Sequence, residues 1–106
     1  MAIPSLPKLH LPPWFDEGWS ELVTIKQWFS GGFIETSPGT FVQPTFVTLD
    51  RIRSEIGSED FWFDRDVIIL KVLTIDLIEK LLPVLDKKGV FSSMKKFDAI
   101  GWDDAE

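Results

Sequence analysis

Four prolines near the start of this chain constrain its fold more than any other feature. They remove backbone donors and hold the backbone extended, so we expect no regular structure in residues 1–13 (Pro4, Pro7, Pro12 and Pro13). The segment is nevertheless apolar, because eight of the first fifteen side chains are apolar and none is acidic. We therefore predict an extended apolar arm over residues 1–15, which packs either on its own domain or in a groove of a neighbour.

The length and composition predict one globular domain after this arm. The chain has 106 residues, of which 44% are hydrophobic and 26% are charged, as in typical folded proteins. We assign residues 16–100 to the domain and residues 101–106 to an acidic tail. There is no cysteine, which excludes disulfides and thiol chemistry. A secretory signal and a membrane-length apolar run are both missing, so we expect a soluble protein, cytoplasmic or part of a virion, that contacts no membrane.

Apolar residues recur at helical spacing after the arm. Six of them fall on one helical stripe (Phe15, Trp19, Leu22, Val23, Ile25 and Phe29), which predicts a helix over residues 16–30 with Asp16 as its N-cap. We expect Trp19 and Phe29 to lie in the core. Trp28 lies off this stripe, and it either covers a second surface or faces a partner.

Two further elements are expected in the middle of the chain. Residues 33–36 and 40–43 predict a small hairpin, because the Pro-Gly pair between them favours a tight turn. Apolar residues then return to helical spacing from Pro44 onward (Phe46, Leu49, Ile52 and Ile56). This spacing predicts a second helix, which ends at Gly57.

The contrast between residues 66–73 and residues 75–88 is the strongest structural signal. The first range is almost continuously apolar and predicts a buried strand. The second separates into two faces and predicts a helix capped by Thr74 and Gly89, with one apolar side (Leu77, Ile78, Leu81, Leu82, Val84 and Leu85). Pro83 should kink this helix or end it one turn early.

Together these elements predict an α+β fold. We expect three or four helices, a small sheet that includes residues 66–73, and the extended N-terminal arm. An all-α fold is the alternative, because residues 66–82 could form one continuous helix. Such a helix would be apolar on every side, which favours the division into strand and helix.

Asp64 and Asp66 form the best catalytic arrangement in the sequence. At the start of a strand their side chains would project to one face, where they could bind a metal or act as an acid and base pair. A simpler explanation is that these charged residues are solvated where a buried strand begins.

The other candidate sites are weaker. His10 has no second strong ligand nearby, and Gly31 belongs to no phosphate-binding loop. We therefore expect no enzyme activity, no metal and no cofactor.

Acidic and aromatic side chains indicate a protein partner. The net charge of −6 argues against binding to nucleic acid. Residues 55–66 hold five acids and one base. Within this range Phe61, Trp62 and Phe63 cannot all point inward from an extended segment, because adjacent side chains alternate between faces. One face of the segment is therefore left to pack under the arm or to bind another protein.

We predict a non-enzymatic structural or adaptor subunit of a homo- or hetero-oligomeric protein assembly. A virion or phage tail is one setting in which arms lock neighbouring subunits together. The expected partner-binding side chains lie in the arm and among the tryptophans (Ile3, Leu6, Leu9, Leu11, Trp14, Trp28 and Trp62). The alternative is a small acidic inhibitor or regulator that occupies a basic groove on its partner. A hydrolase based on Asp64 and Asp66 is the third hypothesis.

Overall fold

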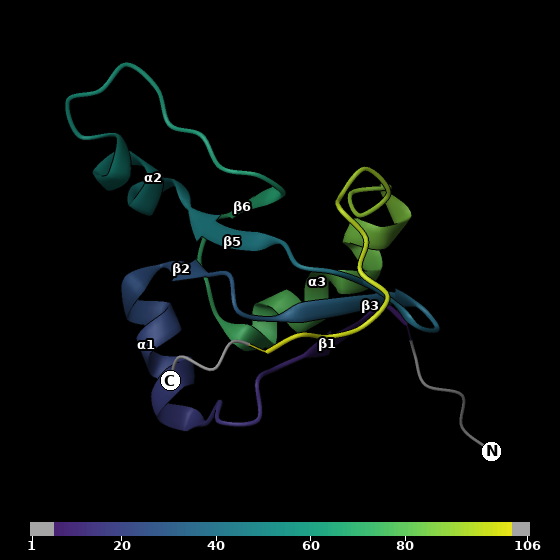
Figure 1. Cartoon of the computed structure of the whole chain (residues 1–106). Coiled ribbons are helices and arrows are strands. Elements are labelled where there is room, and N and C mark those ends of the chain that lie inside the picture. Colours follow the sequence, from purple (N-terminus) through teal and green to yellow (C-terminus); the bar gives the residue numbers. More distant parts are fainter. Residues whose placement is uncertain (1–5, 103–106) are drawn as a thin grey trace.

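The computed structural model describes residues 6–102, which form an α+β fold with two three-stranded sheets (Figure 1). Its helices are α1 (Glu17–Lys26), α2 (Leu49–Ile56) and α3 (Ile75–Lys87). Its strands are β1 (Lys8–His10), β2 (Trp28–Phe29), β3 (Phe33–Ser37), β4 (Thr40–Val42), β5 (Thr45–Thr48) and β6 (Val67–Leu70). The predicted α+β class is confirmed, with two sheets in place of one. The start of the predicted arm and most of the predicted tail lie outside the described residues.

The first sheet joins β1, β3 and β4 in that order, with antiparallel pairing throughout. β3 and β4 form the predicted hairpin, and its turn contains Gly39 at φ 78°. β1 pairs with β3 and buries Leu9. The expectation that residues 1–13 contain no regular structure is therefore wrong for β1. This strand fits between Pro7 and Pro12 at the edge of the sheet, where prolines are tolerated.

The second sheet joins β2, β5 and β6, and β6 runs parallel to β5. The prediction that the second helix begins near Pro44 is wrong, because residues 45–48 form β5 and the helix begins at Leu49. The residues of β5 are β-branched or aromatic and all buried, which favours a central strand. Thr48 caps α2 by accepting a hydrogen bond from the backbone N of Arg51 at 3.2 Å. Gly57 follows the last helical residue, as predicted.

α1 begins as predicted but ends earlier. Asp16 caps it, because its Oδ1 accepts a hydrogen bond from the backbone N of Trp19 at 3.1 Å. The predicted continuation to residue 30 is wrong, since Gln27 adopts a left-handed conformation at φ 58° and the chain turns into β2. Phe29 is buried as predicted, whereas Trp19 is 43% exposed and does not belong to the core.

α3 agrees closely with its predicted bounds. Thr74 caps its start, and Gly89 takes a left-handed conformation at φ 76° beyond its end. Ile78 and Leu82 are buried on the inner side, as expected. Val84 was expected there too, but it is half-exposed, because it lies at the margin of the apolar face.

Pro83 neither shortens α3 nor ends it. The helix continues through this residue to Lys87, in contrast to the prediction of an early end. Pro83 is exposed, so its ring faces solvent rather than a packed neighbour. The helix then lacks one backbone donor. The buried Ile78 and Leu82 before the proline and the partly buried Leu85 after it hold the helix against the core.

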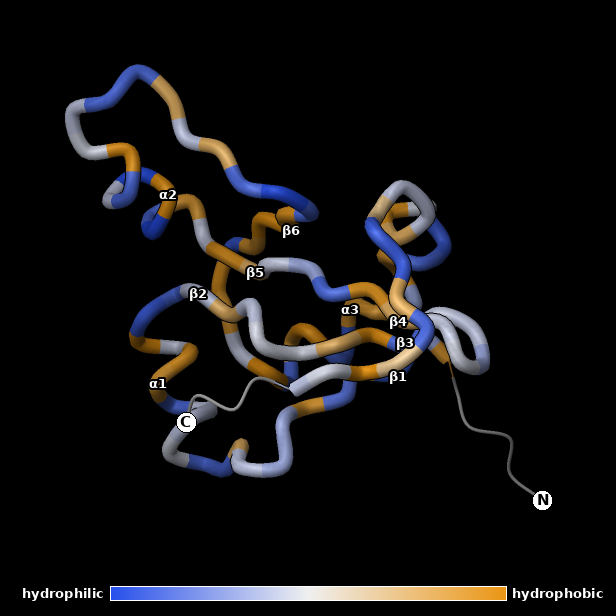
Figure 2. The backbone as a smooth tube through the Cα atoms, viewed as in Figure 1, coloured by the Kyte–Doolittle hydropathy of each residue, from blue (hydrophilic) through white to orange (hydrophobic). Residues whose placement is uncertain are grey.

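The core joins both sheets to α1 and α3, and the hydrophobic segments of β3, β4 and α3 lie together in Figure 2. Leu9 from the predicted arm and Phe91 and Met94 from the segment after α3 belong to the same cluster. Phe97 and Phe41 exchange backbone hydrogen bonds of 2.7 and 2.9 Å, which tie this last segment to β4. Within residues 6–102, no helix is long and apolar enough to cross a membrane.

Candidate protein-binding surfaces

α2 and the loop that follows it project from the body of the molecule (Figure 1). The chain leaves β5, passes through α2 and residues 57–66, and returns to the parallel strand β6. We name residues 57–66 the tip segment. No residue of α2 is buried, although its apolar side chains fall on one side. The projection therefore presents side chains at a distance from the core.

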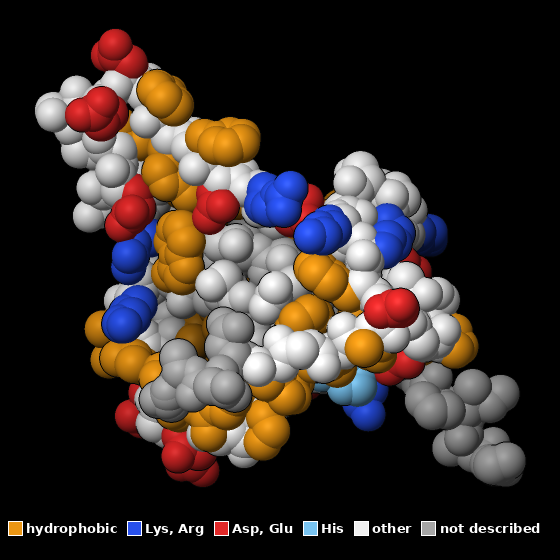
Figure 3. All heavy atoms as spheres, viewed as in Figure 1, with side chains coloured by type: hydrophobic (Ala, Val, Ile, Leu, Met, Phe, Trp, Pro, Cys, Tyr) orange, Lys and Arg blue, Asp and Glu red, His pale blue; other side chains and the backbone are white. Residues whose placement is uncertain are grey.

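The tip segment exposes two phenylalanines. Phe61 is 73% exposed and Phe63 is 81% exposed, whereas Trp62 between them is partly buried. The predicted alternation of this run is therefore confirmed, with the tryptophan directed inward. Apolar side chains are visible along the projection in Figure 3. Contiguous exposed apolar patches are uncommon on folded monomers, so these two side chains make the tip segment a candidate binding surface.

Trp62 fixes the tip segment to the second sheet. Its ring meets the ring of Trp28 on β2 edge to face, with centroids 6.0 Å apart and an interplanar angle of 87°. The guanidinium of Arg51, on α2, lies 5.3 Å from the centroid of Trp28. The tip segment, β2 and α2 thus share one aromatic and cationic cluster, which positions the two outward phenylalanines.

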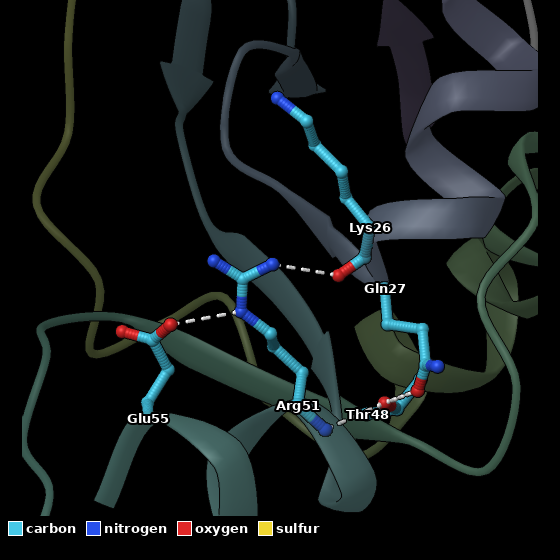
Figure 4. Close-up of polar contacts among 5 residues, drawn as sticks. All are labelled: Lys26, Gln27, Thr48, Arg51 and Glu55. Carbon is cyan, nitrogen blue, oxygen red and sulfur yellow. Dashed lines mark hydrogen bonds and ion pairs between the residues drawn. The ribbon is translucent and has the colours of Figure 1, made fainter.

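Arg51 also fastens α2 to the end of α1 (Figure 4). Its Nη1 donates to the backbone oxygen of Lys26 at 2.9 Å, and its Nε donates to Glu55 Oε2 at 3.0 Å. Beside it, the Thr48 hydroxyl donates to the side-chain oxygen of Gln27. The contacts with Lys26 and Gln27 join segments far apart in sequence, so they fix the base of the projection to the end of α1.

The tip segment carries a negative charge. Glu59, Asp60 and Asp64 are exposed there, and Arg65 is its one basic residue. No ion pair within the described residues involves any of these four side chains. The two phenylalanines therefore lie among carboxylates whose charge is not neutralised by a neighbouring base.

Asp64 and Asp66 lie before the first residue of β6 and not within the strand. Asp66 has a left-handed backbone at φ 52° and precedes β6, so the alternation of a strand does not relate the two side chains. Asp64 Oδ1 accepts from the backbone N of Arg65 at 2.8 Å, and Asp66 Oδ2 accepts from the backbone N of Lys95 at 3.3 Å. Each carboxylate therefore has its own structural partner. No group of three potential metal ligands occurs in the part of the chain that the structure describes.

A second surface lies beside α1. Trp14, Trp19 and Trp28 line a cavity of about 290 Å³, with Pro12 and Phe15 also at its wall. We name this cavity the tryptophan groove. Its lining is mainly apolar, and Lys26 is the one charged residue that lines it within residues 6–102. The groove therefore suits an apolar ligand with few polar groups.

The predicted partner-binding residues are distributed over several environments. Ile3 lies outside the described residues, and Leu9 is buried in the core of its own chain, so Leu9 is not free to contact a partner. Leu6 and Leu11 are partly buried. Trp14 and Trp28 both line the tryptophan groove, and Trp62 contacts Trp28 from the tip segment.

Phe61, Phe63 and Trp19 were missed as candidate site residues. The run of three aromatics around Trp62 indicated that one face would be left uncovered, but it did not indicate which face. The burial of Trp62 against Trp28 decides this, and that contact is not local in sequence. Trp19 was assigned to the core because it fell on the helical stripe, which continues further than α1 does.

His10 and Glu35 hold β1 in the first sheet. His10 Nε2 lies 2.9 Å from Glu35 Oε1, and the backbone N of Gly39 donates to Glu35 Oε2 at 3.3 Å. The hydrogen bond with His10, and to a smaller extent that from Gly39, holds the pKa of Glu35 below its ordinary value of 4.5. The His10 ring also meets Phe41 edge to face at 5.7 Å. His10 is therefore a structural contact between strands.

Comparison with known proteins gives no assignment for these surfaces. No protein-family model, no curated protein and no solved structure matches this chain. The tip segment and the tryptophan groove are therefore interpreted from their own geometry and chemistry.

Proposed function

We propose that this protein is a non-enzymatic adaptor or structural subunit that binds another protein through the tip segment. The observation that carries this proposal is the exposure of Phe61 and Phe63 on a tip segment that Trp62 fixes to the second sheet. The predicted function class is kept, but the main contact moves from the N-terminal arm to the tip segment. A virion setting remains a prediction from the sequence.

The energetic reason lies in the two phenylalanine side chains. Burying one large apolar side chain contributes about 1.5 to 3 kcal/mol, so two adjacent ones offer a compact source of binding energy. Binding energy concentrates in such aromatic side chains near the centre of an interface. The contact between Trp28 and Trp62 already orders the segment, which lowers the entropy lost on association.

The charge of the tip segment defines the chemistry of the partner. Glu59, Asp60 and Asp64 surround the phenylalanines, so the complementary surface is basic and has apolar pockets. Charges at the rim would speed association and select the partner, whereas the aromatic side chains would supply most of the affinity. The expected interface is thus aromatic at its centre and acidic at its edge.

Affinity purification from extracts of the native cells tests this proposal with three tagged forms of the full chain. These are the wild type, the double variant Phe61→Ser/Phe63→Ser, and the control Leu49→Ser, which removes an exposed apolar side chain of α2 outside the tip segment. We expect wild type and control to retain one protein in near-stoichiometric amount. The double variant should retain about tenfold less or lower, because it loses both aromatic contacts. Equal recovery by all three forms would contradict the proposal.

The acidic side chains support a second candidate, a small inhibitor or regulator that occupies a basic groove. In that case electrostatic attraction dominates, and binding should fall steeply between about 0.1 and 0.5 M salt as screening increases. The double variant Glu59→Gln/Asp60→Asn should then lose more binding than Phe61→Ser/Phe63→Ser. The adaptor proposal predicts the opposite order.

A further inference from the structure

We infer that the tryptophan groove binds the proline-rich N-terminal segment of a second copy of this chain. This surface lies beside α1 and is separate from the exposed phenylalanines of the tip segment. The inference therefore goes beyond the proposed function, because it gives the subunit a way to associate with itself.

The lining of the groove is suited to prolines. Trp14 is 40% exposed and Trp19 is similarly open, so two indole rings are accessible beside Pro12 and Trp28. Aromatic grooves bind proline-rich segments, because flat rings pack against pyrrolidine rings and the extended ligand loses little entropy on binding. The scarcity of charge in the lining agrees with such a ligand.

The chain itself contains a segment with the required chemistry. Pro4, Ser5, Leu6 and Pro7 form a Pro-x-x-P sequence, which is the spacing that such grooves recognise. Met1 and Ile3 add apolar side chains, and residues 1–7 contain no charged side chain. This segment therefore matches a groove whose lining is almost entirely uncharged.

The direction of β1 favours a neighbouring molecule over the same one. β1 runs from Lys8 toward Pro12 at the groove, so Leu6 and Pro7 precede the strand at its end away from the groove. The five residues before Leu6 reach at most about 18 Å when extended, and turning back along β1 would use much of that reach. A second copy can present the same residues to the groove without any reversal.

An arm of one copy in the groove of the next is a contact between two different surfaces. Such contacts generate open chains or closed rings, of which a pair that exchanges arms is the smallest. Each subunit would then keep its tip segment free for a different protein.

Light scattering and NMR on the full chain test the inference. The arm variant is Ile3→Ser/Pro4→Ser, the groove variant is Trp19→Ser, and Ser5→Ala is the control within the arm. We expect the mass of wild type and control to rise with concentration, while each variant alone stays monomeric. An equimolar mixture of the two variants should form dimers, because one supplies an intact groove and the other an intact arm. A synthetic peptide of residues 1–9 should shift the indole signals of Trp14 and Trp19 in the arm variant.

Three results would overturn the inference. The first is a wild-type mass that stays monomeric at every concentration together with groove signals that the peptide does not move. The second is a difference in the Trp14 and Trp19 indole signals between the arm variant and a wild type that remains monomeric, both without peptide. Such a difference would place the arm in the groove of its own chain. The third is self-association that both variants retain. The variant Phe61→Ser/Phe63→Ser should associate like the wild type, so failure here is distinguishable from failure of the proposed function.

Discussion

Leu9→Ala tests whether β1 belongs to the fold or acts as a free arm. Leu9 is 8% exposed and lies in the core cluster, with its Cδ1 close to Gly32. Removing most of this side chain loses its transfer energy and leaves a cavity, for an expected cost of about 2 to 5 kcal/mol. Even the lower value would reduce the melting temperature by about 8 to 16 °C in a domain of this size. Thermal and urea unfolding followed by circular dichroism measure both quantities.

Lys8→Ala is the matched control for this measurement. Lys8 occupies the same strand but is exposed, so its replacement should change stability by no more than about 0.5 kcal/mol. Equal effects at Leu9 and Lys8, or a loss of self-association by Leu9→Ala without any loss of stability, would refute the placement of β1 in the core. Leu9 would then be the partner contact that the sequence suggested.

Three further substitutions test particular contacts. Ile78→Ala should cost about 2 to 5 kcal/mol, because Ile78 is fully buried on α3, whereas the exposed Glu79→Ala should stay within about 0.5 kcal/mol in urea unfolding. Gly32→Ala should cost about 1 to 3 kcal/mol, since a Cβ there would lie 3.0 Å from the Phe29 ring, while Gly31→Ala meets only ordinary contacts and should be nearly neutral. Because the pKa of Glu35 is lowered in the fold, its carboxylate stabilises the fold fully above about pH 4.5 and loses this contribution as the pH falls. The variant Glu35→Gln should therefore lose less stability than the wild type on acidification, as measured by thermal unfolding at pH values from 6 to 3.

The elements that the sequence predicted well depend on local signals. The hairpin turn at Gly39, the caps at Asp16 and Thr74, and the apolar run of β6 each involve residues that are neighbours in the chain. The prediction that residues 66–73 form a buried strand is only partly right, because β6 is limited to Val67–Leu70 and Ile69 is exposed at the edge of the sheet. Turn and cap preferences arise from backbone conformation and from hydrogen bonds within a few residues. Such features require no knowledge of the rest of the fold.

The elements that were mistaken depend on distant partners. β2 and β5 pair with each other, and β5 also pairs with β6, so their extended conformation is stabilised by contacts across the chain. Phe29 and Phe46 each fit a helical stripe when only spacing is considered, and Trp28 falls within the predicted helix although it lies off that stripe. Burial in a sheet overrides that spacing, and the left-handed conformation of Gln27 has no strong sequence signal.

The candidate site was partly visible in the sequence. The alternation of Phe61, Trp62 and Phe63 and the acidic residues around them could be read directly. The inward direction of Trp62 depends on Trp28 and Arg51, which lie on other elements. The groove likewise requires the end of the arm and α1 to meet, which only the fold can show.

Site-specific photo-crosslinking tests the central claim most directly. A benzoylphenylalanine at position 63 would replace the exposed Phe63 of the tip segment, and the same residue at position 84 would replace the half-exposed Val84 of α3 as the control. In native cells we predict that position 63 crosslinks to one basic protein and that position 84 does not. Crosslinking of the same protein with equal yield from both positions, or of no protein from position 63, would contradict binding through the tip segment.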